Sequence, residues 1–479
     1  MSAVLAAIAR HALERPDFAA LVGGGFAMNY AQLDAAVSEL AHTLASELGD
    51  GRGCVALALD NSPAWVLIDL AVMKLSRPCL PLPTFFTPAQ VDATLHDAGA
   101  QWLLTSDEQG KPLQVAHQTV WLQRLDGSEG RLHPGTAKVT YTSGSTGAPK
   151  GVCLSLPQME QVAQSIVTRF GVSFAGVHAP ILPLGVLLEN VAGLYSVLLA
   201  GGCYHVQSAH ELGCDNPFKP DFARMGAALR AARATSLILV PELMRGIMAA
   251  RAFGVMELPA LDLIAVGGAK VAPELIAMAR GLSMPVYEGY GLTECASVVA
   301  VNAPNGERGG SVGRPLDHIR AYIAADGEII IGDAGFLGYA GHAAKSGPTH
   351  TGDIGELDED GFLYVKGRKD NLIITSFGRN VSPEWVECEL LAEPVIRHAL
   401  VFGEGRPELR ALIAPIYPGL ERDVIAASVE RANARLPAYA RIGGFEVLGP
   451  LSADAGDLTG NGRVRRNAVL AKYSSFVNG

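Results

Sequence analysis

Short apolar runs alternate with segments of helical length along the first part of this 479-residue chain. Val55–Leu59, Cys79–Leu82 and Trp102–Thr105 have the composition of buried strands, whereas Ala64–Leu75 and Pro88–Ala98 have the length of helices. Because helical crossovers join parallel strands, this alternation predicts a parallel sheet with helices on both faces. With 49% hydrophobic residues, the chain can bury a large core in two or three domains.

The sequence pattern changes in the later part of the chain. The alternation continues from Ser236 to Ala279, with one helix expected over Pro241–Arg251 and another that Pro273 opens. Beyond about Gly310 the sequence is rich in glycine and β-forming residues, with a hairpin signal at Asp360-Gly361, and Ser382 and Pro383 then open a further helix. A boundary at Gly367–Asp370 separates a core domain, residues 1–368, from a small domain, residues 369–479. The predicted class is α/β: a large N-terminal domain of parallel or mixed sheets flanked by helices, a β-rich subdomain, and a small α+β C-terminal domain.

Charge and composition exclude several kinds of protein. The net charge of −10 lacks the basic excess that a nucleic-acid or anionic-membrane surface needs. The seven cysteines never form a C-x-x-C pair, so we expect neither a zinc site nor a disulfide framework. Met1–Arg15 has the pattern of an ordinary first helix and not that of a signal peptide, and Glu189 and Asn190 interrupt the apolar span Ile181–Cys203. We therefore expect a cytoplasmic protein without a membrane span.

The stretch Lys138–Val152 reads K-V-T-Y-T-S-G-S-T-G-A-P-K-G-V and has the chemistry of a phosphate-binding loop. Its glycines free backbone N–H groups to approach an anion, its hydroxyls add donors, and Lys150 adds a positive charge. The ending lacks the Gly-Lys-Ser/Thr of a Walker loop. A flexible Gly/Ser linker is the alternative, but a strand enters this stretch and a helix opened by a Ser155–Gln158 capping box follows it. The candidate phosphate-binding residues here are Thr142, Ser143, Gly144, Ser145, Thr146, Gly147 and Lys150.

Four further stretches follow in order: Gly267–Lys270, Tyr287–Glu294, Thr351–Asp353 and Gly367–Glu387. Together with the loop they resemble the motifs of the adenylate-forming superfamily of AMP-dependent synthetases and ligases. That superfamily includes acyl-CoA synthetases, aryl-CoA ligases, peptide-synthetase adenylation domains and beetle luciferases. Each stretch alone is a weak signal, whereas five in register across most of the chain are specific.

The resemblance implies a set of nucleotide-binding residues. Tyr290 would stack on adenine, Thr293 would bond the α-phosphate, and Glu294 would bind Mg²⁺. Asp353 would accept the ribose hydroxyls and Arg368 would reach the ribose or phosphate, although in isolation these two could form a surface ion pair. The further ATP- or AMP-binding candidates are Gly268, Ala269, Glu288, Gly289 and Gly291.

The same resemblance implies a reaction. A substrate carboxylate attacks the α-phosphate of Mg-ATP, pyrophosphate leaves, and an acyl-adenylate forms. The small, mobile C-terminal domain then pivots at Asp370 so that a thiol, either CoA or the phosphopantetheine of a carrier protein, can attack. The implied catalytic residues are Lys150, Thr293, Glu294 and Arg463.

The acid is predicted to be apolar. Adenylation domains that load amino acids carry an aspartate where Leu184 stands here, and a buried ammonium without a counter-ion is costly. Leu184, Val186 and Leu187 offer an apolar wall that favours a fatty or other uncharged carboxylic acid. The alternative is that these side chains belong to the core.

Two positions depart from the family pattern. Arg463 stands where a C-terminal lysine normally approaches the substrate carboxylate, and a planar guanidinium does not replace a compact ammonium conservatively. Arg465 and Arg466 are alternative cations for that role. Phe377 stands where glycine usually borders the pantetheine channel, so it adds bulk beside the expected path of the thiol.

These departures leave a second hypothesis open. The chain could be a degenerate adenylate-binding homologue with little turnover and a regulatory or scaffold role. A generic phosphate-loop NTPase would release ADP rather than AMP, and the missing Walker ending disfavours it.

Overall fold

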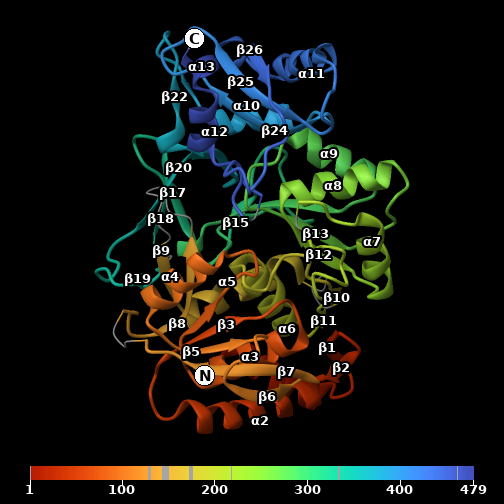
Figure 1. The fold of residues 1–479 in the computed structure, drawn as a ribbon, viewed down its shortest axis with the longest axis vertical. Coiled ribbons are helices and arrows are strands. Elements are labelled where there is room, and N and C mark those ends of the chain that lie inside the picture. Colours follow the sequence, from red (N-terminus) through yellow and green to blue (C-terminus); the bar gives the residue numbers. More distant parts are fainter. Residues whose placement is uncertain are drawn as a thin grey trace.

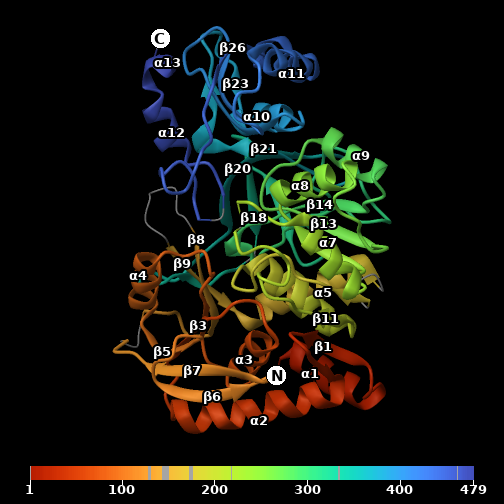
Figure 2. The ribbon, with the colours of Figure 1, turned by 45° about the vertical axis from the view of Figure 1, so that its right-hand side comes forward.

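The computed structural model describes residues 2–127, 131–142, 150–171, 176–216, 218–332, 335–460 and 462–478. Two large sheets, a four-stranded sheet and flanking helices form the N-terminal part, and a smaller unit follows. Figures 1 and 2 show this C-terminal unit, in blue, at the opposite end of the long axis from the N-terminus. The predicted α/β class with a large N-terminal and a smaller C-terminal domain is confirmed.

An eight-stranded sheet carries the strand that leads to the phosphate-loop segment. The four central strands, β8, β4, β3 and β5, are parallel to one another, and the strands at both edges pair antiparallel with their neighbours. In sheet order the strands are β19 (Gly338–Tyr339), β9 (Lys150–Ser155), β8 (Thr136–Thr142), β4 (Cys79–Pro81), β3 (Cys54–Ala58), β5 (Ala100–Thr105), β7 (Gln118–Arg124) and β6 (Lys111–Val115).

A nine-stranded sheet carries the second wall of the candidate site. Its strands from β14 to β1 are parallel, and an antiparallel strand or pair closes each end. In sheet order they are β16 (Arg314–Pro315), β15 (Ala300–Val301), β14 (Val286–Tyr290), β13 (Leu263–Val266), β12 (Ser236–Leu239), β10 (Val177–His178), β11 (Cys203–His205), β1 (Ala19–Gly23) and β2 (Phe26–Asn29).

Helices flank these two sheets. They are α1 (Ala3–Glu14), α2 (Tyr30–Leu48), α3 (Pro63–Lys74), α4 (Pro88–Ala98), α5 (Leu156–Phe170), the π-helix η2 (Leu188–Tyr195), α6 (Ser196–Ala200), α7 (Phe222–Ala231), α8 (Pro241–Ala252) and α9 (Pro273–Gly281). The sequence predicted α1, α3, α4, α5, α8 and α9 but no element between residues 19 and 48. There, Asn29 and Gln32 form a reciprocal capping box that opens α2. None of the helices in the described ranges is long and apolar enough to cross a membrane.

The β-rich subdomain is a four-stranded antiparallel sheet of β17 (Arg320–Ile323), β18 (Glu328–Gly332), β20 (Thr349–Leu357) and β21 (Leu363–Arg368). The predicted Asp360-Gly361 turn joins β20 to β21, and Gly361 has a φ of +79°. This hairpin sets Asp353 directly opposite Arg368 in the register. Two charged side chains of the candidate site are thereby held by one strand pair.

The C-terminal unit has its own hydrophobic core and rests on the N-terminal part. Ser382 caps α10, as predicted. Arg245 of α8 donates to the carbonyl oxygens of Ile396 and Arg397, which fixes one contact between the two parts. The elements are β22 (Ile373–Ile374), β23 (Asn380–Val381), α10 (Pro383–Leu391), β24 (Ile396–Phe402), β25 (Leu409–Pro415), α11 (Arg422–Arg435), β26 (Ile442–Val447), α12 (Arg466–Lys472) and α13 (Ser474–Asn478).

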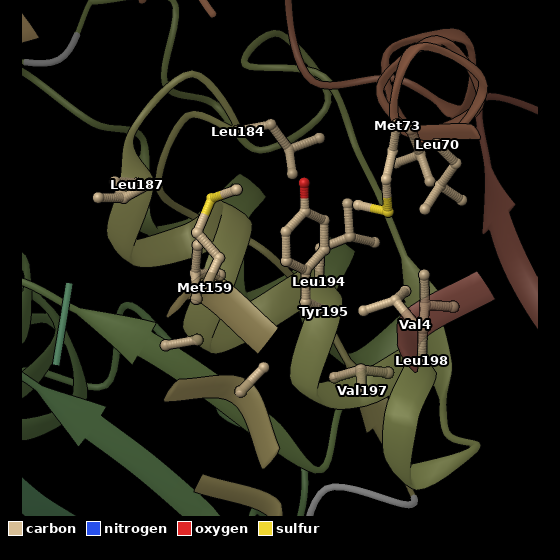
Figure 3. Close-up of a cluster of buried hydrophobic side chains, with 14 of the residues drawn as sticks. Val4, Leu70, Met73, Met159, Leu184, Leu187, Leu194, Tyr195, Val197 and Leu198 are labelled. Carbon is tan, nitrogen blue, oxygen red and sulfur yellow. The ribbon is translucent and has the colours of Figure 1, made fainter. Parts of the chain in front are cut away.

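A buried polar cluster, the Lys138 quartet, ties β8 to two helices. It consists of Lys138, Asp69 of α3, and Asn190 and Tyr195 of η2. Lys138 Nζ donates to Asp69 Oδ1 at 2.8 Å, to Tyr195 Oη at 2.9 Å and to Asn190 Oδ1, and Tyr195 donates to Asp69 Oδ2 at 2.7 Å. Figure 3 shows Tyr195 among apolar side chains that include Met73 and Met159. A buried charge pair of this kind persists only when each member is bonded, so the quartet fixes β8 against η2.

Candidate active site

The phosphate-loop segment connects two antiparallel strands. Thr142 at the end of β8 lies opposite Lys150 at the start of β9. The sequence prediction placed a strand before this segment and a capped helix after it. The intervening strand β9 was missed, and α5 begins only at Leu156, with Ser155 as its cap. Five predicted phosphate-binding residues lie outside the described residues, and only the backbone of Thr142 is described. The five are Ser143, Gly144, Ser145, Thr146 and Gly147.

Lys150 and Glu294 meet at a common neighbour, Tyr339 of β19. The Tyr339 hydroxyl donates to Glu294 Oε1 at 2.8 Å. Lys150 Nζ lies 5.5 Å from the centre of the Tyr339 ring, within the range of a cation–π contact. Burial, with Glu294 as a second cause, raises the pKa of the Tyr339 phenol, so it remains a proton donor at neutral pH. The predicted phosphate-binding lysine and the predicted metal ligand are therefore connected through one side chain.

Backbone geometry fixes Thr293 and Glu294. They lie in the short 3-10 turn η3 (Thr293–Cys295), and the amide of Gln158 donates to the Glu294 carbonyl at 2.9 Å. Two non-glycine residues directly after the turn have positive φ, Ala296 at 54° and Ser297 at 102°. Such strain persists only where the surrounding structure enforces it, and it is concentrated at functional sites. Gly291 is required here, because a Cβ at this position would lie 1.5 Å from the Ser297 carbonyl oxygen.

The residues at this turn fit a magnesium ion that also binds phosphates. Glu294 is half-buried, and within the described part of the chain only Tyr339 donates to its carboxylate, through Oε1. Among the described residues none donates to Oε2, which would serve as a hard oxygen ligand. Among the described residues no group of three or more His, Cys, Asp or Glu side chains could hold a metal. Magnesium in nucleotide sites commonly takes one or two carboxylates together with phosphate and water oxygens, which this arrangement allows.

Tyr290, Asp353 and Arg368 form a hydrogen-bonded chain. The Tyr290 hydroxyl donates to Asp353 Oδ2 at 2.5 Å, and Arg368 Nη1 lies 3.1 Å from Asp353 Oδ1. Asp353 is 7% exposed, and its burial raises its pKa, whereas Tyr290 and Arg368 act in the opposite direction. The half-exposed Arg368 and the buried carboxylate are more than a surface ion pair, because Tyr290 fixes the carboxylate from the other side.

The glycine turn after β13 receives a side chain from the C-terminal unit. Gly268 has a φ of +86°, and Arg463 Nη2 donates to its carbonyl oxygen at 2.9 Å. Arg463 extends from the Leu458–Val464 turn, whose Gly460 lies so near Phe85 that a Cβ there would be 2.6 Å from the Phe85 carbonyl oxygen. The C-terminal unit therefore contacts the glycine turn after β13 and the segment between β4 and α4.

Glu288 has an inward position in this wall. Its side chain is 4% exposed and accepts the Val271 N–H at 3.1 Å, and burial raises its pKa to about 7. Val271 lies just beyond the Gly267–Lys270 turn, so the carboxylate braces that turn. Ala269 is exposed, and Gly289 lies within β14 between Glu288 and Tyr290.

The other basic residues near Arg463 are arranged differently. Arg466 donates to Glu387 Oε1 and, at 2.8 Å, to the Val401 carbonyl, so it is engaged inside the C-terminal unit. Arg465 is exposed. Phe377 is 75% exposed at the turn between β22 and β23. Of these three basic side chains, Arg463 is the one that contacts the glycine turn.

The residues predicted to form the acyl pocket are mostly buried. Leu184 and Leu187 are 1% and 7% exposed, and the Leu184 N–H donates to Asn61 Oδ1 at 2.7 Å. Figure 3 shows both leucines in the apolar cluster around Tyr195. Val186 is half-buried, so it is the most accessible of the three predicted residues.

Sequence reasoning missed Tyr339 and the side-chain role of Gln158. Tyr339 follows Gly338, whose φ of +138° and close contact with His133 leave no room for a side chain. A Gly-Tyr pair after a β-rich segment is a weak local signal. Gln158 was noted for a capping box, yet its amide bonds the Glu294 carbonyl.

Comparison with known proteins supplies an independent line of evidence. A sequence model of the AMP-binding enzyme family matches residues 8–343, and a model of the AMP-binding enzyme C-terminal domain matches residues 370–479. An oxalate–CoA ligase of Arabidopsis thaliana is 30% identical over 81% of this chain and 83% of its own length. A long-chain-fatty-acid–CoA ligase of Mycobacterium bovis is 34% identical, but the match spans 44% of this chain and only 40% of the ligase.

The fold agrees with these matches. A crystal structure of the anthranilate CoA ligase AuaEII with anthranoyl-AMP superposes with a TM-score of 0.80 at 18% identity, covering 100% of this chain and 98% of the ligase. At that identity the likeness establishes the fold. The match of the family model over most of the chain establishes more: the chain belongs to the AMP-binding enzyme family, the adenylate-forming superfamily that its motifs predicted.

Proposed function

We propose that this protein joins a carboxylic acid to a thiol through an acyl-adenylate, at the expense of ATP. The observation that carries the proposal is the contact of Arg463 with the Gly268 carbonyl at 2.9 Å. It brings a cation of the C-terminal unit to the wall that holds Tyr290, Thr293 and Glu294. Acid activation requires such a closed arrangement, because water must be excluded while phosphate charge is neutralised.

In the first half-reaction a carboxylate oxygen of the acid bonds to the α-phosphorus of ATP. The bond from that phosphorus to the bridging oxygen breaks, and pyrophosphate leaves with its electrons. Lys150 would neutralise charge on the phosphates, and Thr293 would donate to the α-phosphate. Asp353 would hold the ribose hydroxyls while Tyr290 packs on the adenine. A magnesium ion held by Glu294 would supply further neutralisation when bound.

In the second half-reaction a thiol sulfur bonds to the acyl carbon and the carbon–oxygen bond to AMP breaks. The thiol proton passes to solvent. We place the domain boundary at residue 368, with the hinge at Asp370, which lies in the 3-10 turn η4 (Lys369–Asn371). Rotation there would withdraw Arg463 and bring the β22–β23 turn with Phe377 toward the acyl group. The acceptor is CoA or the phosphopantetheine of a carrier protein.

We propose an apolar acid, fatty or otherwise uncharged, with Val186 at the accessible edge of an apolar wall. Leu184 and Leu187 are buried, which supports an apolar wall. Their own positions are determined by packing in the hydrophobic core. The relatives named above are ligases of different acids, so the acid that this protein activates has to be identified by experiment. All seven cysteines are free thiols and six are buried, which supports a reducing compartment such as the cytoplasm.

Acid-dependent exchange of labelled pyrophosphate into ATP tests the proposal. Purified protein is incubated with ATP, Mg²⁺ and each of a panel of aliphatic, aromatic and dicarboxylic acids. We expect exchange with at least one apolar acid, and no exchange with any acid would contradict the proposal.

The second candidate, an adenylate-binding protein without turnover, is favoured by one observation. The Arg463 guanidinium bonds a main-chain carbonyl, so part of its hydrogen-bonding capacity is used inside the protein. Tight AMP binding without exchange, unchanged in Arg463→Lys, would support this candidate.

A further inference from the structure

Tyr339 contacts both Glu294 and Lys150, two side chains whose relative position matters for the proposed reaction. Glu294 lies in the turn η3, which follows β14 of the nine-stranded sheet, whereas Lys150 begins β9 of the eight-stranded sheet, and 144 positions separate the two along the chain. The Tyr339 hydroxyl bonds the carboxylate at 2.8 Å, and its ring faces the ammonium at 5.5 Å. Figure 1 shows β19 beside β9, the strand that begins with Lys150.

The backbone of Tyr339 is fixed independently of these two contacts. Tyr339 pairs with Val152 in the antiparallel β9–β19 ladder, and its carbonyl is 3.1 Å from the His133 ring nitrogen Nε2. The Phe336 ring packs against it with centroids 5.1 Å apart. A phenol held in this way has little rotational freedom left to lose, so it can orient its partners.

The contact with Glu294 is selective for one oxygen. Tyr339 takes Oε1, and within the described residues nothing else donates to the carboxylate. This bond restrains the carboxylate, and Oε2 accepts no hydrogen bond from any described residue. Groups that orient a metal-binding carboxylate through a hydrogen bond commonly change metal affinity by 10–100-fold when removed.

We propose that Tyr339 is a positioning residue of the nucleotide site: its hydroxyl orients the Glu294 carboxylate toward magnesium, and its ring holds Lys150 toward the phosphates. The inference rests on the proposed function, since magnesium and ATP are the ligands it orients toward. Tyr339 itself touches neither ligand and acts through its two neighbours.

The test measures binding of the unreactive analogue α,β-methylene-ATP by calorimetry, with EDTA and across a magnesium titration. In Tyr339→Phe we expect the magnesium midpoint to rise about tenfold, because the oriented oxygen is lost. Affinity in EDTA should stay at the wild-type value, because the ring facing Lys150 is retained. Tyr339→Leu removes the ring as well, so its affinity in EDTA should fall about threefold.

The matched control is Tyr364→Phe, which removes another phenol–carboxylate contact, at 3.3 Å from Asp358. Its magnesium midpoint should equal that of the wild type. Coupling is tested in Glu294→Gln, in which adding Tyr339→Phe should cause no further change. This cycle separates orientation of Glu294 from a general loss of structure.

Each result decides the matter. A wild-type midpoint in Tyr339→Phe, or equal shifts in Tyr364→Phe, would overturn the role of the hydroxyl while leaving the proposed function intact. Full additivity with Glu294→Gln would do the same. Absence of magnesium-dependent analogue binding in the wild type would overturn both the inference and the proposed function.

Discussion

Arg463 Nη2 lies 2.9 Å from the carbonyl oxygen of Gly268, 195 positions earlier in the chain. Gly268 presents that oxygen because its φ of +86° turns the backbone outward at the end of β13. A hydrogen bond from the Arg463 guanidinium to a main-chain carbonyl thus connects the C-terminal unit to the candidate site.

Replacing Arg463 should slow acid activation far more than it weakens nucleotide binding. We expect Arg463→Ala to reduce acid-dependent pyrophosphate exchange about 100-fold, because a charged donor near the reacting phosphate is lost. Arg463→Lys, which keeps the charge, should retain at least about a tenth of the rate. The neighbouring exposed Arg465 gives the control: Arg465→Ala should exchange at the wild-type rate, and an equal loss there would remove Arg463 from the account.

Stability should depend on pH through Glu288. Its pKa is raised to about 7 from 4.5, so between these values the folded chain binds a proton that the unfolded chain has released. Its contribution to stability is therefore full below about pH 4.5 and is lost as pH rises toward 7. In Glu288→Gln the free energy of unfolding at pH 8 should exceed the wild-type value by about 3 kcal/mol, and the two should converge at pH 4.5.

Urea denaturation at both pH values measures this difference. Glu359→Gln is the matched control, because the Glu359 side chain is exposed to solvent. A Glu288→Gln protein that follows the wild-type pH profile would show that this carboxylate is not the source of the dependence.

Breaking the Lys138 quartet should destabilise the fold strongly. The Lys138 and Asp69 side chains are only 2% and 1% exposed, so Lys138→Met leaves a carboxylate buried without its cation. We expect a loss of about 3–5 kcal/mol in the free energy of unfolding, of which more than half returns in Lys138→Met with Asp69→Asn. The exposed pair Lys111–Glu47 provides the comparison: Lys111→Met should cost less than about 1 kcal/mol. Similar losses at both lysines would contradict this view of the quartet.

Phe377 should affect the thiol step and nothing earlier. Because it is 75% exposed at a turn, Phe377→Gly should leave the free energy of unfolding within about 0.5 kcal/mol of wild type. Pyrophosphate exchange should be unchanged, whereas the KM for the thiol should fall severalfold as bulk is removed beside its path. A change in exchange without a change in the thiol KM would place Phe377 in the first half-reaction instead.

Local signals predicted the elements whose ends are marked in the sequence. Ser382 followed by Pro383 opened α10, Pro273 opened α9, and Asp360-Gly361 turned β20 into β21. The strand β9 was missed because its six residues stand between a glycine-rich segment and a strong helix cap at Ser155. A short apolar run in that position has no period long enough to distinguish it from a loop.

Motif positions predicted which residues gather at the site, but not how each is bonded. The partners of Lys138 are 52–69 positions away from it, and Tyr339 and Glu294 are 45 positions apart. Spacing along the chain therefore does not indicate these contacts. Arg466 stood beside Arg463 in the motif, yet Glu387 of α10 engages it. The bond between Arg466 of α12 and Glu387 of α10 therefore distinguishes the two arginines.

Transfer of a carboxylate oxygen to AMP tests the central claim most directly. An acid that supports pyrophosphate exchange is labelled with ¹⁸O in both carboxylate oxygens and incubated with ATP, Mg²⁺ and either CoA or a phosphopantetheinylated carrier, and the AMP is examined by mass spectrometry. We expect one ¹⁸O atom in each AMP, because the carboxylate attacks the α-phosphorus and its oxygen leaves with AMP. Unlabelled AMP, or ADP as the product, would contradict it.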